Sequence, residues 1–161
     1  MTVMEHLLDT AIHKSIILNV GLKMVNYLEE IGEYELAEAL CIRLIVHDDS
    51  KTRDDEISAL TSIEDKGNME NPEVLISSDS LKAIEIHWKN NRHHPEHFSD
   101  YHNMEEVDII EMVCDWYARS IQKETDFFNF VKTRQENRFH FDKEFFDKVI
   151  HYCNIIASLR I

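Results

Sequence analysis

Histidine and carboxylate residues recur along this sequence in an order that could build a metal centre. Several lie inside strongly apolar segments, where an imidazole or carboxylate without a partner costs roughly several kcal/mol to bury. A bound metal ion would compensate several such groups at once, so the pattern predicts metal chemistry. The candidate ligands are His13, His47, Asp48, His87, His93, His94 and Asp115.

The dipeptide His47-Asp48 follows the apolar segment Leu36–Val46. Taken alone it is weak evidence, because the chain has ten His and 31 acidic residues, and a helix end that reaches solvent would explain it equally well. A carboxylate can bridge two metal ions, whereas an imidazole binds one. Delivered together by a buried helix, the two residues would suit a site with two ions.

His87, Asn91 and His94 have the spacing of residues on one helical face, provided that the helix continues as far as His94. Two imidazoles would then converge. The alternative is a solvated polar face that ends in a His-rich turn, since the stretch from His93 to His102 holds further histidines.

Asp115 is the acidic residue of its segment that apolar neighbours flank most closely. An ion pair with Arg119 would explain it without a metal, and would leave Asp108 and Glu111 at the surface. His13 could likewise be an ordinary hydrogen-bonded core histidine. An antiparallel helical pair could instead bring it beside His47, because a helix of 15 residues spans about 22 Å.

Composition favours helices as the elements that position these residues. The chain has 161 residues, 43% of them hydrophobic, with only three Gly and two Pro. So few turn formers suit an all-α fold, and the length suits one domain of about six or seven helices. Apolar periodicity predicts helices over Thr2–Glu30, Tyr34–His47, Thr52–Ile63, Ser80–Arg92, Met104–Gln122, Thr125–Arg138 and Asp142–Leu159.

Further expectations concern the surroundings of the site. Gly32 should end the first helix, Pro95 should stop the fourth, and Leu36–Val46 should be buried on most of its circumference. Glu64–Ser78 and Pro95–Asn103 read as loops that could cover the metals and set specificity. The aromatic residues of the last two helices are expected to form core, and a homo-oligomer built on part of that surface is the alternative.

Net charge limits the partners. The charge is −14 with His neutral, and no cluster of Lys and Arg stands out, so a nucleic-acid duplex is not an expected partner. Bound divalent metals would still allow a small anionic substrate. Three dispersed cysteines, the lack of a signal-like N-terminus and the lack of a long apolar run predict a soluble, cytoplasmic protein.

The ligand order resembles that of the HD-domain superfamily of metal-dependent phosphohydrolases, over roughly residues 6–120, with 125–160 as C-terminal packing helices. The run His47-Asp48-Asp49-Ser50-Lys51 is similar to the HDxGK segment of the HD-GYP type. The blocks HDDSK, HWKNNRHHPEH and EMVCDW look like an uncharacterised bacterial and phage family related to these hydrolases. Ser50 replaces glycine and no GYP motif follows, so cyclic dinucleotide hydrolysis is not implied.

The resemblance implies a role for each matching position. His13, His47, Asp48 and Asp115 would bind one ion, and Asp48 would bridge to a second ion held by His87 and either His93 or His94. Lys51 would face the substrate. The ions would be divalent, with Mn, Fe, Co, Ni, Mg and Zn all open.

Three functions follow from these expectations. In the first, two ions activate water to hydrolyse a small phosphorylated substrate such as a nucleotide, while Glu56 and Glu111 orient ligand imidazoles or relay a proton. In the second, the same scaffold resembles the inositol oxygenase type and holds a di-iron oxygenase centre. In the third, the chain is a non-catalytic helical binding module.

Overall fold

The computed structural model describes residues 2–61 and 78–159, and over these residues the fold is all-α with seven α-helices. The predicted fold class is therefore confirmed. The α-helices are α1 (Val3–Glu30), α2 (Tyr34–Val46), α3 (Asp54–Thr61), α4 (Ser78–Asn90), α5 (Glu106–Gln122), α6 (Phe127–Arg134) and α7 (Lys143–Ser158). Short 3-10 turns η1 (Asp49–Thr52), η3 (Pro95–His97) and η4 (Tyr101–Asn103) and the π-helical turn η5 (Gln135–Phe139) join them.

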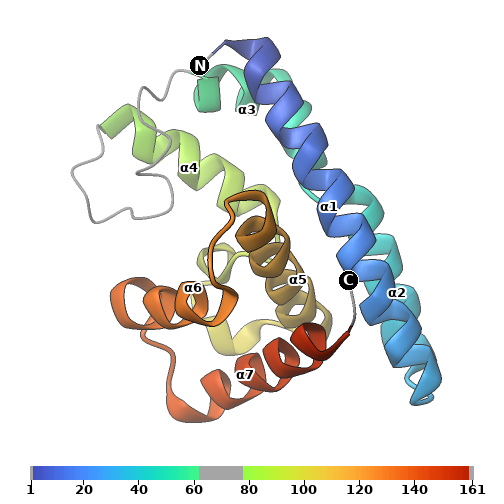
Figure 1. Ribbon diagram of the computed structural model, residues 1–161. Coiled ribbons are helices and arrows are strands. Elements are labelled where there is room, and N and C mark those ends of the chain that lie inside the picture. Colours follow the sequence, from blue (N-terminus) through green and yellow to red (C-terminus); the bar gives the residue numbers. More distant parts are fainter. Residues whose placement is uncertain (1, 62–77, 160–161) are drawn as a thin grey trace.

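Helices α1 and α2 form a long antiparallel pair along one side of the molecule (Figure 1). Gly32, with φ +86°, ends α1 as predicted, because the amides of Gly32 and Glu33 donate to the carbonyls of Glu29 and Leu28 in a Schellman arrangement. Gly21 lets the two helices approach closely, since a Cβ there would lie 2.4 Å from the Leu44 side chain. The predicted hairpin of helices therefore exists.

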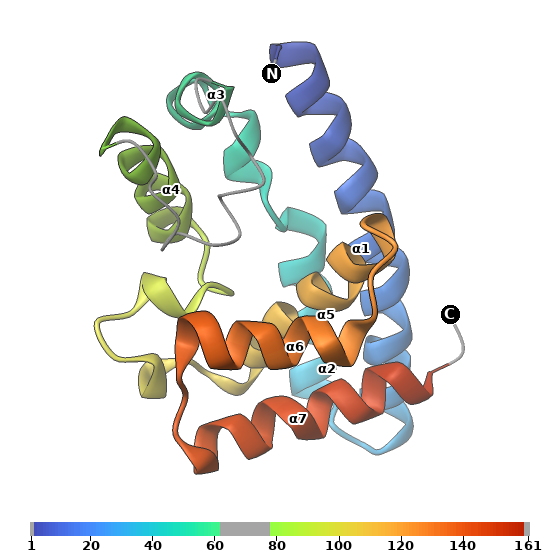
Figure 2. The same cartoon turned by 60° about the vertical axis from the view of Figure 1, so that its left-hand side comes forward.

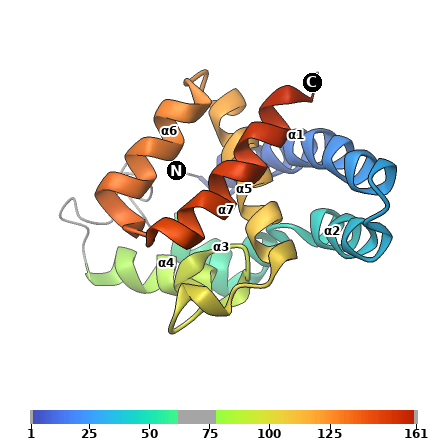
Figure 3. The same ribbon diagram turned by 90° about the horizontal axis from the view of Figure 1, so that it is seen from below.

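Helix α5 is the centre of the fold and packs against α1, α2, α6 and α7. Seen from below, α6 and α7 lie on the side of α5 that faces away from α2 (Figure 3). Helices α3 and α4 lie side by side at another edge of the molecule (Figure 2). The largest buried cluster joins α1, α2, α5 and α7 and includes Ile17, Leu40, Ile110 and Ile156.

The C-terminal aromatic residues contribute to this core, as expected: Phe127, Phe141 and Phe145 are each buried, although Phe128 is 44% exposed. The exposed His102, in η4, links η4 to the N-terminus of α7. His102 lies 2.6 Å from an oxygen of Asp100 and 2.5 Å from an oxygen of Asp142, which also caps the N-terminus of α7.

The expectation for α2 was wrong in one respect. Ile42, Ile45 and Val46 are 56%, 60% and 51% exposed, so the helix is not buried on most of its circumference. The physical reason is that α2 packs against α1 and α5 on one side only, through Leu40, Leu44 and its other buried residues.

Several boundaries also differ. The third helix starts at Asp54 because η1 occupies Asp49–Thr52, and the fourth ends at Asn90, before proline can act. The sixth changes to a π-helical turn after Arg134. Glu64–Ser78 lies, except for its last residue, outside the described residues. Among those described, no helix combines the length and apolar character needed to cross a membrane.

Candidate metal centre

Five segments bring the candidate ligands to one place between α1, α4 and α5. His13 comes from the middle of α1 and Asp115 from α5, while His47 and Asp48 occupy the junction between α2 and η1. His87 lies in the last turn of α4, and the two remaining histidines, His93 and His94, follow that helix. All seven residues that the sequence singled out are therefore neighbours in space.

The backbone at Asp48 is unusual for a residue with a side chain. Helix α2 ends at Val46, His47 is extended, and Asp48 is left-handed with φ 56° and ψ 17°. Asp tolerates this conformation better than most residues, but it still costs free energy. The sharp turn carries the Asp48 carboxylate into the interior, where the residue is 2% exposed.

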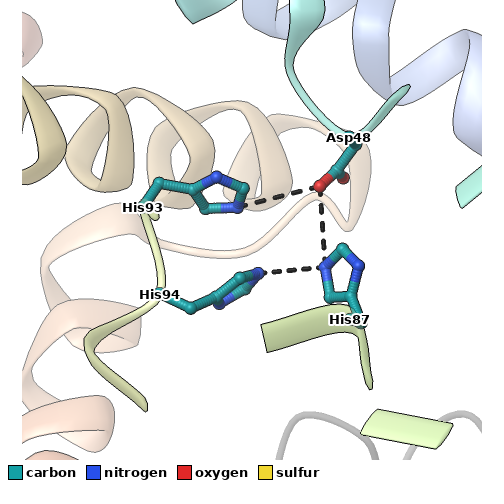
Figure 4. Close-up of side chains that lie close together, drawn as sticks. All are labelled: Asp48, His87, His93 and His94. Atoms are coloured by element: carbon teal, nitrogen blue, oxygen red, sulfur yellow. Dashed lines mark hydrogen bonds and ion pairs between the residues drawn. The ribbon is translucent and has the colours of Figure 1, made fainter. Parts of the chain in front are cut away.

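The two oxygens of Asp48 face different histidines. Oδ2 lies 3.5 Å from Nε2 of His47, whereas Oδ1 lies 3.5 Å from Nε2 of His87 and 3.7 Å from Nε2 of His93. Figure 4 shows His87 and His93 directed at this carboxylate and His94 directed at His87, with Nε2 of His94 3.0 Å from Nε2 of His87. This geometry suits a carboxylate that bridges two ions.

Asp115 completes the other half of the cluster. One of its oxygens, Oδ1, lies 2.7 Å from Nε2 of His13 and 3.7 Å from Nε2 of His47. Its second oxygen, Oδ2, lies 4.0 Å from Nε2 of His93. His13 is thus hydrogen-bonded, as the ordinary core interpretation required, but its partner is another candidate ligand.

Several of these atoms are buried without a hydrogen-bond partner among the described residues: Nδ1 of His13, Nε2 of His47, Oδ1 of Asp48 and Nε2 of His93. Orphaned buried polar atoms are rare and need an explanation. Two ligands about 2.1 Å from one ion lie roughly 3.0 to 3.5 Å apart at right or tetrahedral angles. Most of the separations above fall at or slightly beyond that range, so the residues fit a metal ion.

Glu111 contacts two of the imidazoles through their Nδ1 atoms, opposite the Nε2 atoms that face the centre. Its Oε1 lies 2.9 Å from Nδ1 of His47 and 3.3 Å from Nδ1 of His93, and the residue is 3% exposed. A carboxylate that binds Nδ1 directs the opposite nitrogen, Nε2, toward the ligand position. The geometry expected of Glu111 is present.

Glu56 occupies the equivalent place behind His87. Its Oε2 lies 3.0 Å from Nδ1 of that histidine, and Asn90 donates to Oε1 at 2.7 Å. Asn91 links the same region to η1, because its amide donates to Ser50 Oγ at 2.8 Å and to the carbonyl oxygen of His87 at 2.8 Å. The end of α4 is therefore fixed against η1.

A partly buried network of ion pairs contacts Glu111 in turn. Arg43 Nε donates to Glu111 Oε2 at 2.9 Å, and Arg43 Nη2 donates to Asp108 at 2.5 Å. Arg92 binds Asp108 from the other side, with Nη2 3.0 Å from Oδ2. Asp108 and Glu111 are thus buried, which contradicts the alternative that placed both at the surface.

Charge interactions divide the histidines into two kinds. Burial lowers the pKa of His13, His87 and His94, which favours the neutral form that binds metals. Burial would also lower the pKa of His47, but the nearby carboxylates of Asp48 and Asp115 and the hydrogen bond to Glu111 outweigh it and raise that pKa to about 10.

The carboxylates stay ionised. Burial opposes this, but Lys51 and the surrounding imidazoles hold the pKa of Asp48 well below its usual range, and the hydrogen bond from His13 and the nearby imidazole of His47 do the same for Asp115. The centre therefore combines ionised carboxylates with three imidazoles of lowered pKa, whereas His47 would have to give up its proton to bind a divalent cation.

Lys51 lies at the edge of this centre. Its Nζ is 2.5 Å from Asp48 Oδ2, and the carbonyl oxygen of Lys51 lies 3.0 Å from Nε2 of the buried His6. Lys51 also lines a pocket with a volume of about 150 Å³, whose lining includes Asp48, His87 and Asp115.

One sequence argument was wrong although its conclusion holds. His94 does not share a helical face with His87, because α4 ends at Asn90 and the chain turns through Asn91. The turn itself brings the two rings together. Sequence reasoning missed His6, Arg43 and Asn90; their partners are 34 to 68 residues away, and no local pattern signals such pairs.

Comparison with known proteins adds a family and no activity. Neither a curated protein nor a solved structure matches the chain. A family model described as "Family of unknown function (DUF5662)" matches residues 2–154. Seven of the chain's histidine and aspartate side chains surround one buried centre. Because the family model covers most of its length, the chain belongs to the DUF5662 family.

Proposed function

We propose that the protein binds two divalent metal ions and hydrolyses a phosphoester bond in a small phosphorylated molecule. The observation that carries the proposal is the set of buried, converging and unpartnered atoms around Asp48. A module without bound metal would leave these buried groups uncompensated, since burying them costs free energy.

The proposed ligand sets follow the two faces of Asp48. His13, His47 and Asp115 would hold one ion, His87 and His94 would hold the other, and Asp48 would contribute to both sets. His93 lies between the sets, 3.7 Å from Asp48 Oδ1 and 4.0 Å from Asp115 Oδ2. The geometry therefore does not assign His93 to one ion rather than the other.

When bound, the ions would supply Lewis-acid activation of water and of the phosphoryl group. The chain's own residues would do the positioning. Glu111 and Glu56 would keep the imidazoles oriented, and Lys51 would donate to a phosphoryl oxygen at the mouth of the centre. Because Lys51 Nζ now contacts Asp48 Oδ2, it would exchange that contact for the substrate.

The resemblance to HD-domain phosphohydrolases supports this reaction class over others. The pocket also offers several cationic side chains beside the centre, which suits an anionic substrate. Iron-dependent oxygenation by the same ligands is the second chemistry that such a donor set could serve, and it is separated from hydrolysis by experiment rather than by geometry.

The test is a panel of phosphomonoesters and phosphodiesters, assayed with Mn, Co, Ni, Mg, Fe or Zn supplied. Turnover by the parent that is lost in Asp48→Ala and kept in Asp49→Ala would support hydrolysis, since Asp49 is an exposed neighbour paired with Lys14. No hydrolysis with any metal would overturn it. Substrate-dependent oxygen uptake by an iron-loaded protein would redirect the assignment to an oxygenase.

A further inference from the structure

The pocket beside the metal centre has a second cationic region that the proposed reaction does not use. Besides Lys51, its lining includes four basic residues from the ends of α5 and α6 and from η5: Arg119, Lys123, Arg134 and Arg138. Five of the 17 Lys and Arg residues thus line this pocket in a chain of net charge −14. The acidic residues of the same lining are Asp48 and Asp115 of the metal centre and Asp9, which lies 3.9 Å from Arg119. The positive charge of the remaining basic residues, Lys123, Arg134 and Arg138, favours an anionic ligand.

Arg138 is held rigidly. Its Nε and Nη2 donate to Glu96 Oε1 at 2.8 and 2.5 Å, a bond that does not engage Nη1. The guanidinium carbon lies 5.2 Å from the centre of the Trp88 ring and 4.8 Å from that of Phe139. A planar guanidinium placed between aromatic rings is oriented before any ligand arrives.

Arg134 is built into the wall in a similar way. The residue is 8% exposed, and its guanidinium carbon lies 4.6 Å from the centre of the Phe130 ring. It is the last residue of α6, immediately before the π-helical turn η5. Such turns occur frequently at functional sites. Gln135 fixes this turn by exchanging hydrogen bonds with the backbone of Phe141 at 2.8 and 3.0 Å.

The aromatic residues of this wall contact one another or the arginines. Trp116 and Phe139 stack with centroids 5.6 Å apart and an interplanar angle of 19°, while Phe139 and Phe141 stack at 5.0 Å and 3°. Phe130 carries Arg134, and Trp88 carries Arg138. These rings therefore contact arginines or one another within the wall.

We propose that Lys123, Arg134 and Arg138 form a second anion subsite, so that the substrate carries two separated anionic groups. One would be the reacting phosphate at the metals and Lys51. The other, a phosphate or carboxylate, would bind the guanidinium groups, whose fork of N–H donors matches either oxyanion. This inference rests on the proposed function. It favours a substrate with two separated anionic groups over a nucleoside monophosphate, which has one.

The test measures binding rather than turnover. Straight-chain diphosphonates of increasing length and monophosphonates of matching length are titrated calorimetrically into the manganese-loaded protein. The best diphosphonate should bind at least about tenfold more tightly than its monophosphonate, because its second phosphonate would accept further charge-assisted hydrogen bonds. The diphosphonate advantage should fall in Arg134→Gln and Lys123→Gln, while monophosphonate binding stays unchanged.

Two controls keep the outcomes separate. Arg53→Gln removes an exposed positive charge outside the pocket lining and should leave the advantage intact. Lys123 is also exposed, so its variant remains informative if the buried Arg134 variant does not fold. The subsite would be overturned if the parent bound diphosphonates no more tightly than monophosphonates. It would also be overturned if both variants kept the tighter diphosphonate binding, because metal chelation alone would then explain it. Failure of every phosphonate to bind, together with no ester turnover, would overturn the proposed function itself.

Discussion

The substitution Glu111→Gln should weaken metal binding without removing any proposed ligand. Glu111 Oε1 contacts Nδ1 of His47 and of His93, and Oε2 accepts from Arg43 Nε. The amide of glutamine must direct its NH2 group either at Arg43 or at the imidazoles. At one of these two contacts the hydrogen bond is then lost, because two N–H donors face each other there.

The magnitude follows from the geometry. Loss of an outer carboxylate typically lowers metal affinity by about 10- to 100-fold, or roughly 1.4–2.7 kcal/mol. The free energy of unfolding of the metal-free protein should fall by about 1–3 kcal/mol, because Arg43 loses one charge-assisted bond and keeps the one to Asp108.

The assay is calorimetric titration of Mn²⁺ into the metal-free protein, with chemical unfolding of the same samples. Glu38→Gln is the matched control, because it removes a charge from an exposed position of α2. Parent-like Mn²⁺ affinity in a correctly folded Glu111→Gln protein would refute the idea that this carboxylate orients the imidazoles.

Three further predictions concern other parts of the molecule. Glu56→Gln should lower the affinity of the ion at His87 by roughly tenfold and leave the other ion in place, as measured by stepwise metal titration. Gly21→Ala should destabilise the protein by about 1–3 kcal/mol in chemical unfolding, because the new Cβ would overlap Leu44 between two packed helices. The acidic neighbours of His102 raise its pKa above 6.5, so its contribution to stability is fully present below pH 6.5 and is lost as pH rises through the raised value. Thermal unfolding across that window should show this decline.

Controls make these predictions specific. Asp54→Asn changes an exposed carboxylate near Glu56 and should not affect metal titration. Adding Leu44→Ala to Gly21→Ala should cost less than the sum of the single changes, since it removes the overlap. His102→Gln should abolish the pH-dependent decline, whereas His151→Gln, at another exposed histidine, should not. The opposite result in any pair would contradict the corresponding structural argument.

The sequence was sufficient for the fold class and for the group of residues that meet in the interior. Apolar periodicity marks helices, and acidic or imidazole groups such as Asp48 and Asp115 inside apolar segments mark places where burial needs compensation. The role of these residues as ligands stays a prediction. Gly32 was readable because a helix end has a local signature.

Other features depend on tertiary packing and could not be read locally. Helix α2 is as apolar as a buried helix, yet Ile42 and Ile45 are exposed because packing covers one side only. The bonds from Arg43 to Asp108 and Glu111 join residues 65 and 68 positions apart. The approach of His94 to His87 depends on a turn after α4 rather than on helical spacing.

The most direct test of the central claim is the metal content of the purified protein, compared with Asp48→Ala and Asp49→Ala. Elemental analysis after reconstitution should find about two ions per chain in the parent and in Asp49→Ala, and a clear loss in Asp48→Ala, because Asp48, unlike Asp49, faces both sets of histidines. Absence of metal from all three proteins would contradict the account and leave a helical binding module.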